Sequence, residues 1–289
     1  MKRLYLLICT LCLLVSCAQA QTAPPQRVVS LYGSFAEAWL QAGGTLVGIT
    51  EDAVSERHLT LDEQVQIIGT TKEPNLELIL ALAPDLVILS ADIPAQMRVM
   101  ELLEQAKVPC RAYRVDTYLD YAQMMDEFTQ LTGRRDLYQT QIPPMMASIR
   151  QLIHQAAKQP SPSLLLIRAY SFGAKAKAED NLAGVILRDL NGDNIASRQP
   201  SLLEEMTLEA IVIEDPEFIF ITVMGQDTQG ALDALEASYG QNPAWQHLSA
   251  VKAGRVHVLP KELFHYKPNA RWGESYAYLF NLLYGPQVP

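Results

Sequence analysis

A helix–turn–strand pattern occurs twice in this chain of 289 residues and limits the folds that the chain can adopt. Residues 75–89 read NLELILALAPDLVIL, and residues 207–221 read TLEAIVIEDPEFIFI. Each copy has Leu-Glu, an apolar run, a proline seven residues after the glutamate, an acidic residue and a second apolar run. The two glutamates, Glu77 and Glu209, are 132 residues apart, and so are the two prolines. Continuous apolar runs are typical of strands buried on both faces of a parallel sheet, so the repeat predicts two related α/β units.

The predicted elements alternate between strand and helix on either side of a helical middle segment. This alternation is typical of parallel α/β architecture. Strand patterns are absent from residues 119–159, where the apolar spacing is helical and Pro143-Pro144 predicts that a helix begins or kinks. We therefore expect two lobes joined by a helical segment. The predicted strands cover residues 27–31, 46–50, 65–69, 84–90, 110–115, 164–170, 218–223 and 254–260.

The N-terminus has the composition of an export signal. Lys2 and Arg3 precede an apolar run that ends at Val15 and is too short to span a membrane. The stretch LVSC resembles the bacterial lipobox, in which Cys17 becomes the lipidated first residue, and the alternative is ordinary cleavage after AQA at residues 18–20. The chain then divides into a signal peptide (1–16), a flexible tether (17–26), an N-terminal lobe (27–135), a bridging helix (136–160) and a C-terminal lobe (161–289).

Composition and motifs argue against several classes of function. The formal net charge is −9 and the 23 basic residues are scattered, whereas nucleic-acid binding needs a basic face. The sequence contains no phosphate-binding loop, dinucleotide-binding glycine motif, nucleophile elbow or HExxH motif. The five histidines do not fall at metal-ligand spacing, so we assign no metal site and no intrinsic cofactor. Cys110 is expected to remain as a lone buried thiol. A binding protein is therefore favoured over an exported enzyme.

Candidate ligand-binding residues follow the predicted strands. In open α/β sheets, ligands bind beyond the carboxyl ends of the strands. Aromatic, cationic and small side chains hold these positions here, and together they predict a ligand wall. Each aromatic taken alone is equally consistent with capping of a hydrophobic core. The positions are Tyr32, Thr71, Lys72, Ala91 and Asp92 in the first half, and Tyr170, Phe172, Met224, Gly225 and residues 265–267 in the second.

The chain resembles a known family from Arg27 to about Leu283. The resemblance rests on residues 27–50, RVVSLYGSFAEAWLQAGGTLVGIT, on the first copy of the repeat, and on residues 242–260, NPAWQHLSAVKAGRVHVLP. These stretches are similar to the helical-backbone class of substrate-binding proteins of bacterial ABC importers, the family that delivers iron–siderophore complexes, haem and vitamin B12. The resemblance implies two Rossmann-like lobes with parallel sheets, bridged by one long helix, in a lipid-anchored extracytoplasmic monomer. Pro143-Pro144 departs from the family pattern and predicts that this helix is interrupted.

The resemblance also accounts for the repeated glutamate. In this family each lobe presents a surface glutamate to arginines of the transporter's membrane subunits, and the matching positions are Glu77 and Glu209. Two lobes then meet the two copies of a permease dimer. The alternative is that both glutamates lie in first helical turns, where the macrodipole favours an acidic side chain. That alternative does not explain their shared register.

A ferric siderophore is the ligand that the resemblance implies first, haem is the main alternative, and cobalamin is third. Many ferric siderophores are anionic, which suits cations set among aromatic side chains. Arg271 is the first choice because its planar guanidinium fits carboxylate or catecholate oxygens, and the alternative is a solvated helix residue. For haem, Tyr170 or His265 would supply an axial ligand. The ligand-binding residues that we predict are Tyr32, Lys72, Tyr170, Phe172, His265, Lys267, Arg271 and Trp272.

Overall fold

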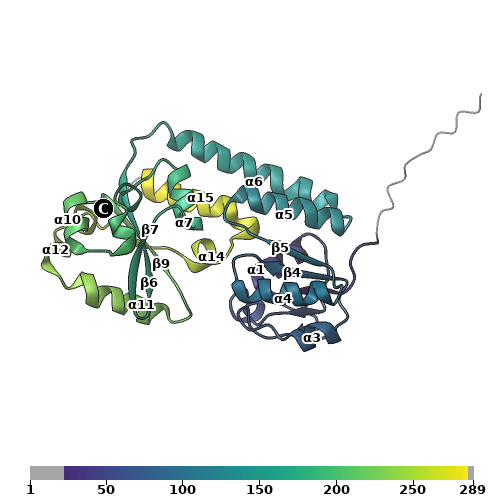
Figure 1. Ribbon diagram of the computed structural model, residues 1–289. Helices are drawn as coiled ribbons and strands as arrows, with labels where there is room; N and C mark the ends of the chain where they lie inside the picture. Colours follow the sequence, from purple (N-terminus) through teal and green to yellow (C-terminus); the bar gives the residue numbers. More distant parts are fainter. Residues whose placement is uncertain (1–22, 286–289) are drawn as a thin grey trace, which may run out of the picture.

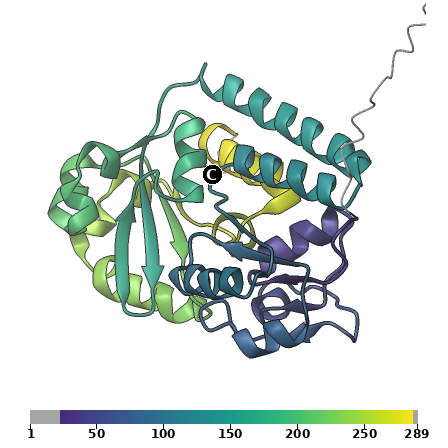
Figure 2. The same cartoon turned by 45° about the vertical axis from the view of Figure 1, so that its right-hand side comes forward.

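The computed structural model describes residues 23–285 of the chain. The predicted signal peptide and the lipidation site at Cys17 lie outside the described residues. Two α/β lobes lie side by side along one long helix, α6 (Arg135–Ala156), which spans both of them (Figure 1). The turned view in Figure 2 shows the same arrangement, with the N-terminal lobe in purple and blue and the C-terminal lobe in green. The predicted class of fold, two α/β lobes bridged by a long helix, is confirmed.

The N-terminal lobe is built on a sheet of five parallel strands in the order β3-β2-β1-β4-β5. Its strands are β1 (Val28–Ser30), β2 (Gly48–Ile49), β3 (Gln66–Ile67), β4 (Leu86–Ser90) and β5 (Cys110–Tyr113). Its helices are α1 (Gly33–Gln41), α2 (Asp52–Ser55), α3 (Leu76–Ala81) and α4 (Pro94–Gln105), and α5 (Tyr118–Leu131) leads into α6.

The C-terminal lobe has a mixed sheet in the order β10-β9-β6-β7, with β8 beside the start of β6. β7 runs antiparallel to β6, and the sequence analysis missed this strand. Its sequence, GAKAK, has neither β-branched nor aromatic residues, so it forms through its pairing with β6. The strands are β6 (Ser163–Tyr170), β7 (Gly173–Lys177), β8 (Asp193–Asn194), β9 (Phe218–Val223) and β10 (Val256–Val258). The helices are α7 (Leu182–Asp189), α8 (Ile195–Arg198), α9 (Ser201–Glu204), α10 (Leu208–Glu214), α11 (Thr228–Leu235), α12 (Pro243–Gln246), α13 (Ser249–Lys252), α14 (Lys261–Phe264) and α15 (Trp272–Tyr284).

The sequence repeat becomes the same backbone path in each lobe. Asn75 caps the start of α3, where its side chain accepts a hydrogen bond from a backbone N–H of the first turn, and Thr207 does the same for α10. Both helices are followed by a residue in the left-handed region, Ala83 (φ 45°) and Asp215 (φ 40°). A proline comes next in each copy and prevents the helix from continuing.

The acidic residue after that proline holds the start of the neighbouring strand. The carboxylate of Asp85 accepts a hydrogen bond from the backbone N–H of Arg27 at 3.0 Å, just before β1. The carboxylate of Glu217 accepts one from Ser163, the first residue of β6, at 3.2 Å. In each pair the acidic residue's own N–H donates back to its partner's carbonyl. The repeat therefore aligns β4 with β1 and β9 with β6.

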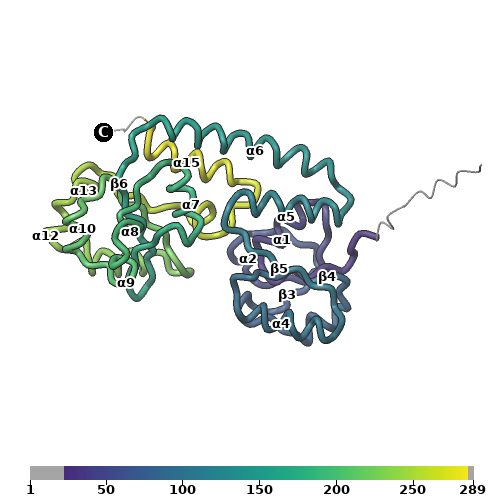
Figure 3. Tube along the Cα trace, turned by 45° about the horizontal axis from the view of Figure 1, so that its top comes forward, coloured from purple at the N-terminus to yellow at the C-terminus, as the bar shows by residue number. Residues whose placement is uncertain are grey.

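α6 runs without interruption through Pro143 and Pro144, so the expected break in the bridging helix is wrong. A proline inside a helix removes one backbone hydrogen bond and costs about 3 kcal/mol or more. Both prolines are exposed, whereas Ile142 and Ile149 are buried in the core below. Burial of the inner face of α6 against α5 and α15 offsets this cost (Figure 3).

One hydrophobic core extends through both lobes. In each central strand the side chains alternate between this shared core and a core that belongs to one lobe alone. Leu164 and Leu166 of β6, for example, join the shared core, while Leu165 and Ile167 face the outer side of the C-terminal sheet. α15 supplies Trp272, Tyr276, Leu279 and Leu283 to the shared core.

We expect Leu279→Ala to lower the free energy of unfolding by about 2–5 kcal/mol, because it leaves a cavity in this core. Chemical denaturation followed by circular dichroism and by tryptophan fluorescence measures the loss. Leu119→Ala, at an exposed position on α5, should change stability by less than about 0.5 kcal/mol. Separate unfolding transitions for the two lobes of the wild type would contradict a shared core.

Candidate ligand-binding cleft

A cavity of about 430 Å³ lies between the lobes, at the carboxyl ends of strands from both sheets. Topology predicts a ligand site at this edge, and the volume is in the range of small-molecule sites. The lining residues are Tyr32, Ser90, Asp92, Ile93, Arg114 and Asp116 from the N-terminal lobe, and Arg168, Asp180, Asn181, Leu182, Met224, Phe264, His265 and Lys267 from the C-terminal half.

The N-terminal wall of the cleft carries two carboxylates, and both are paired with Lys267. Asp92 follows β4, and Asp116 lies beyond β5. The Lys267 ammonium lies 3.1 Å from Asp116 Oδ1 and 3.4 Å from Asp92 Oδ2, with its side chain only 14% exposed. Arg114 Nε also bonds to Asp92, at 3.1 Å. Two of the cations in the cleft are therefore already neutralised by carboxylates.

Arg168 differs from these two cations. It lies on β6, is half-buried, and lines the cleft. Within residues 23–285 its guanidinium makes no ion pair and no hydrogen bond. Asp180 is near enough to feel its charge, but that carboxylate is already bound by Lys177 and Asn181. Arg168 thus offers its donors to an incoming anion.

Two further side chains in the cleft are neutral at physiological pH. Burial lowers the pKa of His265 to about 4, and the positive charges of Lys261 and Arg168 act in the same direction. Burial also raises the pKa of the Tyr32 phenol to about 12. His265 therefore presents a neutral imidazole, which can ligate a metal or accept a hydrogen bond.

The segment that carries His265 and Lys267 is fixed to the N-terminal lobe. The amide of Asn269 donates to the carbonyl of Ser34 and to the carboxylate of Glu37, both at 2.7 Å. Arg57 forms an ion pair with Glu37 and donates to the carbonyl of Lys267 at 3.2 Å. Asn269 has φ 52°, a conformation that asparagine tolerates better than most residues. The width of the cleft is thus constrained at this side.

The structure places three of the predicted ligand-binding residues, Tyr32, His265 and Lys267, in the cleft. Tyr170 and Phe172 lie at the turn between β6 and β7, where their rings stack with centroids 5.2 Å apart.

Five of the predicted ligand-binding residues are not among those that line the cleft, namely Lys72, Tyr170, Phe172, Arg271 and Trp272. Lys72 is exposed in the loop before α3. Arg271, the first choice for binding the ligand, instead holds the Glu274 carboxylate through two bonds of 2.7 Å. Trp272 is fully buried in the shared core, so a ligand in the cleft cannot contact it.

The sequence analysis missed Arg114, Asp116, Arg168 and Asn181. Arg114 and Asp116 lie just beyond β5, so the rule that ligands bind at strand ends would have found them. Arg168 lies inside a predicted strand, and nothing local separates a cleft-facing arginine from a solvated one. Asn181 caps the start of α7, where its side chain accepts a hydrogen bond from Gly184 N–H at 3.2 Å.

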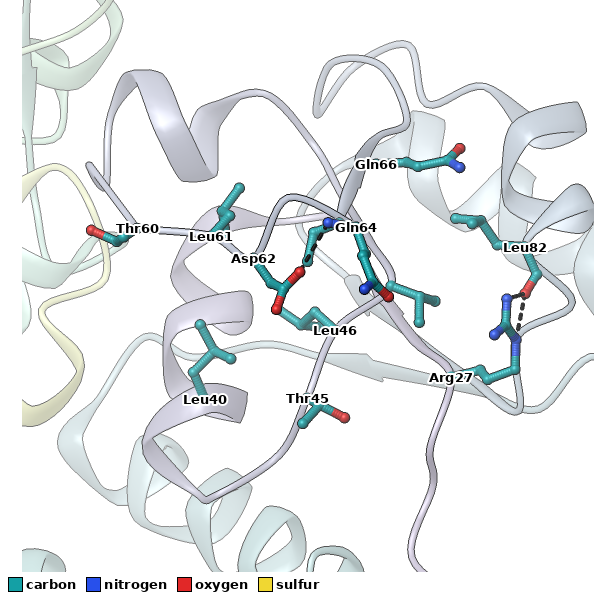
Figure 4. A pocket seen from close by; sticks show the side chains of 12 residues that line it. Arg27, Leu40, Thr45, Leu46, Thr60, Leu61, Asp62, Gln64, Gln66 and Leu82 are labelled. Atoms are coloured by element: carbon teal, nitrogen blue, oxygen red, sulfur yellow. Dashed lines mark hydrogen bonds between the residues drawn. The ribbon is translucent and has the colours of Figure 1, made fainter.

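A second cavity of about 440 Å³ lies on the N-terminal lobe, near the amino ends of β1, β2 and β3 (Figure 4). Its cation, Arg27, already donates to the carbonyl of Leu82 at 2.6 and 2.9 Å. This is the opposite end of the strands from the expected ligand edge. The cleft between the lobes is therefore the better candidate for a ligand site.

The two repeated glutamates, Glu77 and Glu209, are exposed in the first turns of α3 and α10. Neither forms an ion pair within the described residues. In the same part of the chain, no three His, Cys, Asp or Glu side chains gather into a group that could hold a metal ion. No helix there is both long and apolar enough to cross a membrane.

Comparison with known proteins gives consistent matches. The family described as periplasmic binding protein matches residues 28–263. The Fe(3+)-citrate-binding protein YfmC of Bacillus subtilis (strain 168) is 27% identical over 240 residues, which cover 81% of this chain and 72% of the relative. The Fe(3+) dicitrate-binding periplasmic protein FecB of Escherichia coli (strain K12) is 25% identical over 240 residues, covering 80% and 76%. A solved periplasmic heme binding protein from Pseudomonas aeruginosa shares the fold, with a TM-score of 0.71 and 24% identity over 92% of this chain and 95% of that one.

The lowered pKa of His265 predicts a loss of stability in acid. Above pH 6.5 the imidazole is neutral in both the folded and the unfolded chain. As the pH falls from 6.5 towards 4, the unfolded chain takes up a proton that the folded chain does not, so the free energy of unfolding decreases. His265→Gln should lose less stability over this interval than the wild type or His247→Gln, a control at an exposed histidine. Equal pH dependence in all three proteins would refute the assignment.

Proposed function

This chain belongs to the periplasmic binding protein family of ABC importers, and we propose that it captures a ferric chelate of the siderophore or citrate type in the cleft. It then delivers the chelate to a membrane permease without altering it chemically. Two relatives that each cover about four-fifths of this chain are described as binding ferric citrate. The observation that carries the proposal is Arg168, a cation in the cleft that has no partner among the described residues.

The charges of the cleft suit an anionic chelate. Arg168 supplies donors in the planar arrangement that fits carboxylate and catecholate oxygens. Lys267 and Arg114 are held by Asp92 and Asp116, and a bound anion would compete with these carboxylates for them. The neutral Tyr32 phenol can donate a further hydrogen bond. Capture of a preformed complex needs no general base or nucleophile.

Arg168→Ala should weaken binding of ferric citrate roughly 10- to 100-fold, because a hydrogen bond to a charged group contributes about 1.5–3 kcal/mol. Titration by quenching of tryptophan fluorescence measures the affinity. Arg271→Ala is the matched control, since Arg271 lies outside the cleft and is held by Glu274. If the control weakened binding and Arg168→Ala did not, the ligand would bind elsewhere.

Haem is the second candidate, favoured by His265 and Met224, which both line the cleft. A neutral imidazole and a thioether are both known axial ligands of haem iron. A shift of the Soret band when haemin is added, lost in His265→Ala, would identify a haem protein. The absence of such a shift, together with tight binding of a ferric chelate, supports the first candidate. Tight cobalamin binding without any response to iron chelates would overturn both.

The partner we propose is the permease dimer of an ABC importer, met through Glu77 and Glu209. Each glutamate is exposed, each lies in the first turn of a repeated helix, and each adjoins exposed apolar side chains. Leu78 and Leu80 accompany Glu77, while Val212 and Ile213 follow Glu209. This combination of an unpaired charge with apolar surface suits a protein interface. The family acts outside the cytoplasm, and we propose that a lipid on Cys17 keeps the monomeric protein beside its permease.

Charge reversal at both positions, Glu77→Lys with Glu209→Lys, should abolish uptake of the chelate while leaving its affinity unchanged. Each exposed ion pair contributes only about 0.2–1 kcal/mol, so the double variant should be much worse than either single variant. Uptake of radioactive iron by whole cells and titration of the purified protein measure the two effects. Reversal of Glu101, an exposed residue on α4, should leave uptake intact. Normal uptake by the double variant would remove this assignment.

A further inference from the structure

The β6–β7 hairpin sets two cations directly opposite each other beside the cleft. Arg168 on β6 is the pairing partner of Lys175 on β7, so both side chains lie on the same face of the sheet. Neither makes an ion pair or a hydrogen bond within residues 23–285. Like charges at directly opposed positions destabilise a pair of strands. A bound anion would remove this repulsion.

Nearby carboxylates do not neutralise the pair. Asp180 lowers the positive potential around Arg168 but is engaged by Lys177, the next residue on the same face of β7. Glu179 accepts a hydrogen bond from the hydroxyl of Ser197 at 2.6 Å. On the other side of Arg168, the neighbouring position on β9 is Thr222, whose hydroxyl donates to the carbonyl of Ile167. The positive charges of Arg168 and Lys175 therefore remain available to bind an anion.

The turn of the same hairpin carries an aromatic pair, in which Tyr170 is half-buried and Phe172 is exposed. Tyr170 lies two residues beyond Arg168 on β6 and so shares its face of the sheet. The Phe172 ring stacks on Tyr170 with an angle of 23° between the ring planes. Phe172 is 87% exposed, the largest exposed fraction among the large apolar side chains of residues 23–285. One face of this ring pair is open to a planar ligand.

We propose that the β6–β7 hairpin selects a ferric chelate that carries an aromatic ring next to an anionic group. Arg168 and Lys175 bind the anionic oxygens, and the ring stacks on Phe172. The proposal rests on capture of a ferric chelate in the cleft and specifies the class of that chelate. Ferric citrate supplies carboxylates but no ring, so it contacts only the two cations, Arg168 and Lys175. An aryl chelate contacts both these cations and the Phe172 ring.

The experiment compares two probes, ferric dihydroxybenzoate, which has a ring and a carboxylate, and ferric citrate. Phe172→Leu keeps an apolar side chain but removes the ring. Because the position is exposed, we expect the variant to fold normally, and an unchanged Tm checks this. We expect this variant to lose about tenfold in affinity for the aryl probe. Its affinity for ferric citrate should stay within about twofold of the wild type.

Lys175→Gln should weaken binding of both probes, because both carry carboxylates. Lys158→Gln, at an exposed position just beyond α6, is the matched control and should change neither affinity. Leu119→Ala, which shortens an exposed apolar side chain on α5, is the control for Phe172→Leu and should also change neither affinity.

The proposal for the hairpin is overturned if Phe172→Leu binds the aryl probe as the wild type does, or if it weakens both probes equally. It is also overturned if the wild type binds ferric citrate and not the aryl probe, although capture of a ferric chelate would then stand. If the wild type binds neither probe and no other ferric chelate, capture itself fails.

Discussion

Burial of α15 against α6, within a hydrophobic core that includes residues of both sheets, joins the two lobes, and the geometry of the cleft depends on it. Trp272 and Tyr276 lie among the largest fully buried side chains, and both belong to this core. Close-packed interiors resist small displacements, so the lobes cannot slide freely past each other. Asn269, just before α15, adds polar contacts to Ser34 and Glu37 of the other lobe. A cleft held in this way is formed before the ligand arrives, and little binding energy is spent on closing it.

Within the described residues, some of the cations that line the cleft are paired with carboxylates, and one is not. Lys267 crosses from the C-terminal segment to Asp92 and Asp116 and contributes to holding the lobes together. Arg168, on the opposite wall, has no such partner and faces Lys175 across the hairpin. The first arrangement stabilises the empty protein, whereas the second becomes favourable when an anion binds. His265, kept neutral by burial, adds a coordinating or hydrogen-bonding group without adding charge.

The helix–turn–strand repeat has the same local structure in both lobes. A capped helix, a left-handed residue, a proline and an acidic residue recur, and in both copies the acidic residue holds the start of the neighbouring central strand. The same path leaves Glu77 and Glu209 exposed in equivalent first turns. Neither is used inside its own lobe as an ion-pair partner among the described residues. The same fifteen residues thus hold the start of a central strand and carry the glutamate that we propose for docking.

Local sequence determined the α/β class, the two related units, the helical middle segment and the choice of Tyr32, His265 and Lys267 as cleft residues. These features follow from apolar periodicity and from helix caps and prolines, which act over a few residues. Tertiary structure alone decided the continuity of α6 through Pro143-Pro144, because packing against α5 and α15 offsets the local cost. It also decided that Trp272 is buried and that GAKAK becomes a strand. A side chain's partner or burial depends on residues distant in the chain, and no local pattern records them. For the same reason the opposition of Arg168 and Lys175 became visible only when β7 paired with β6.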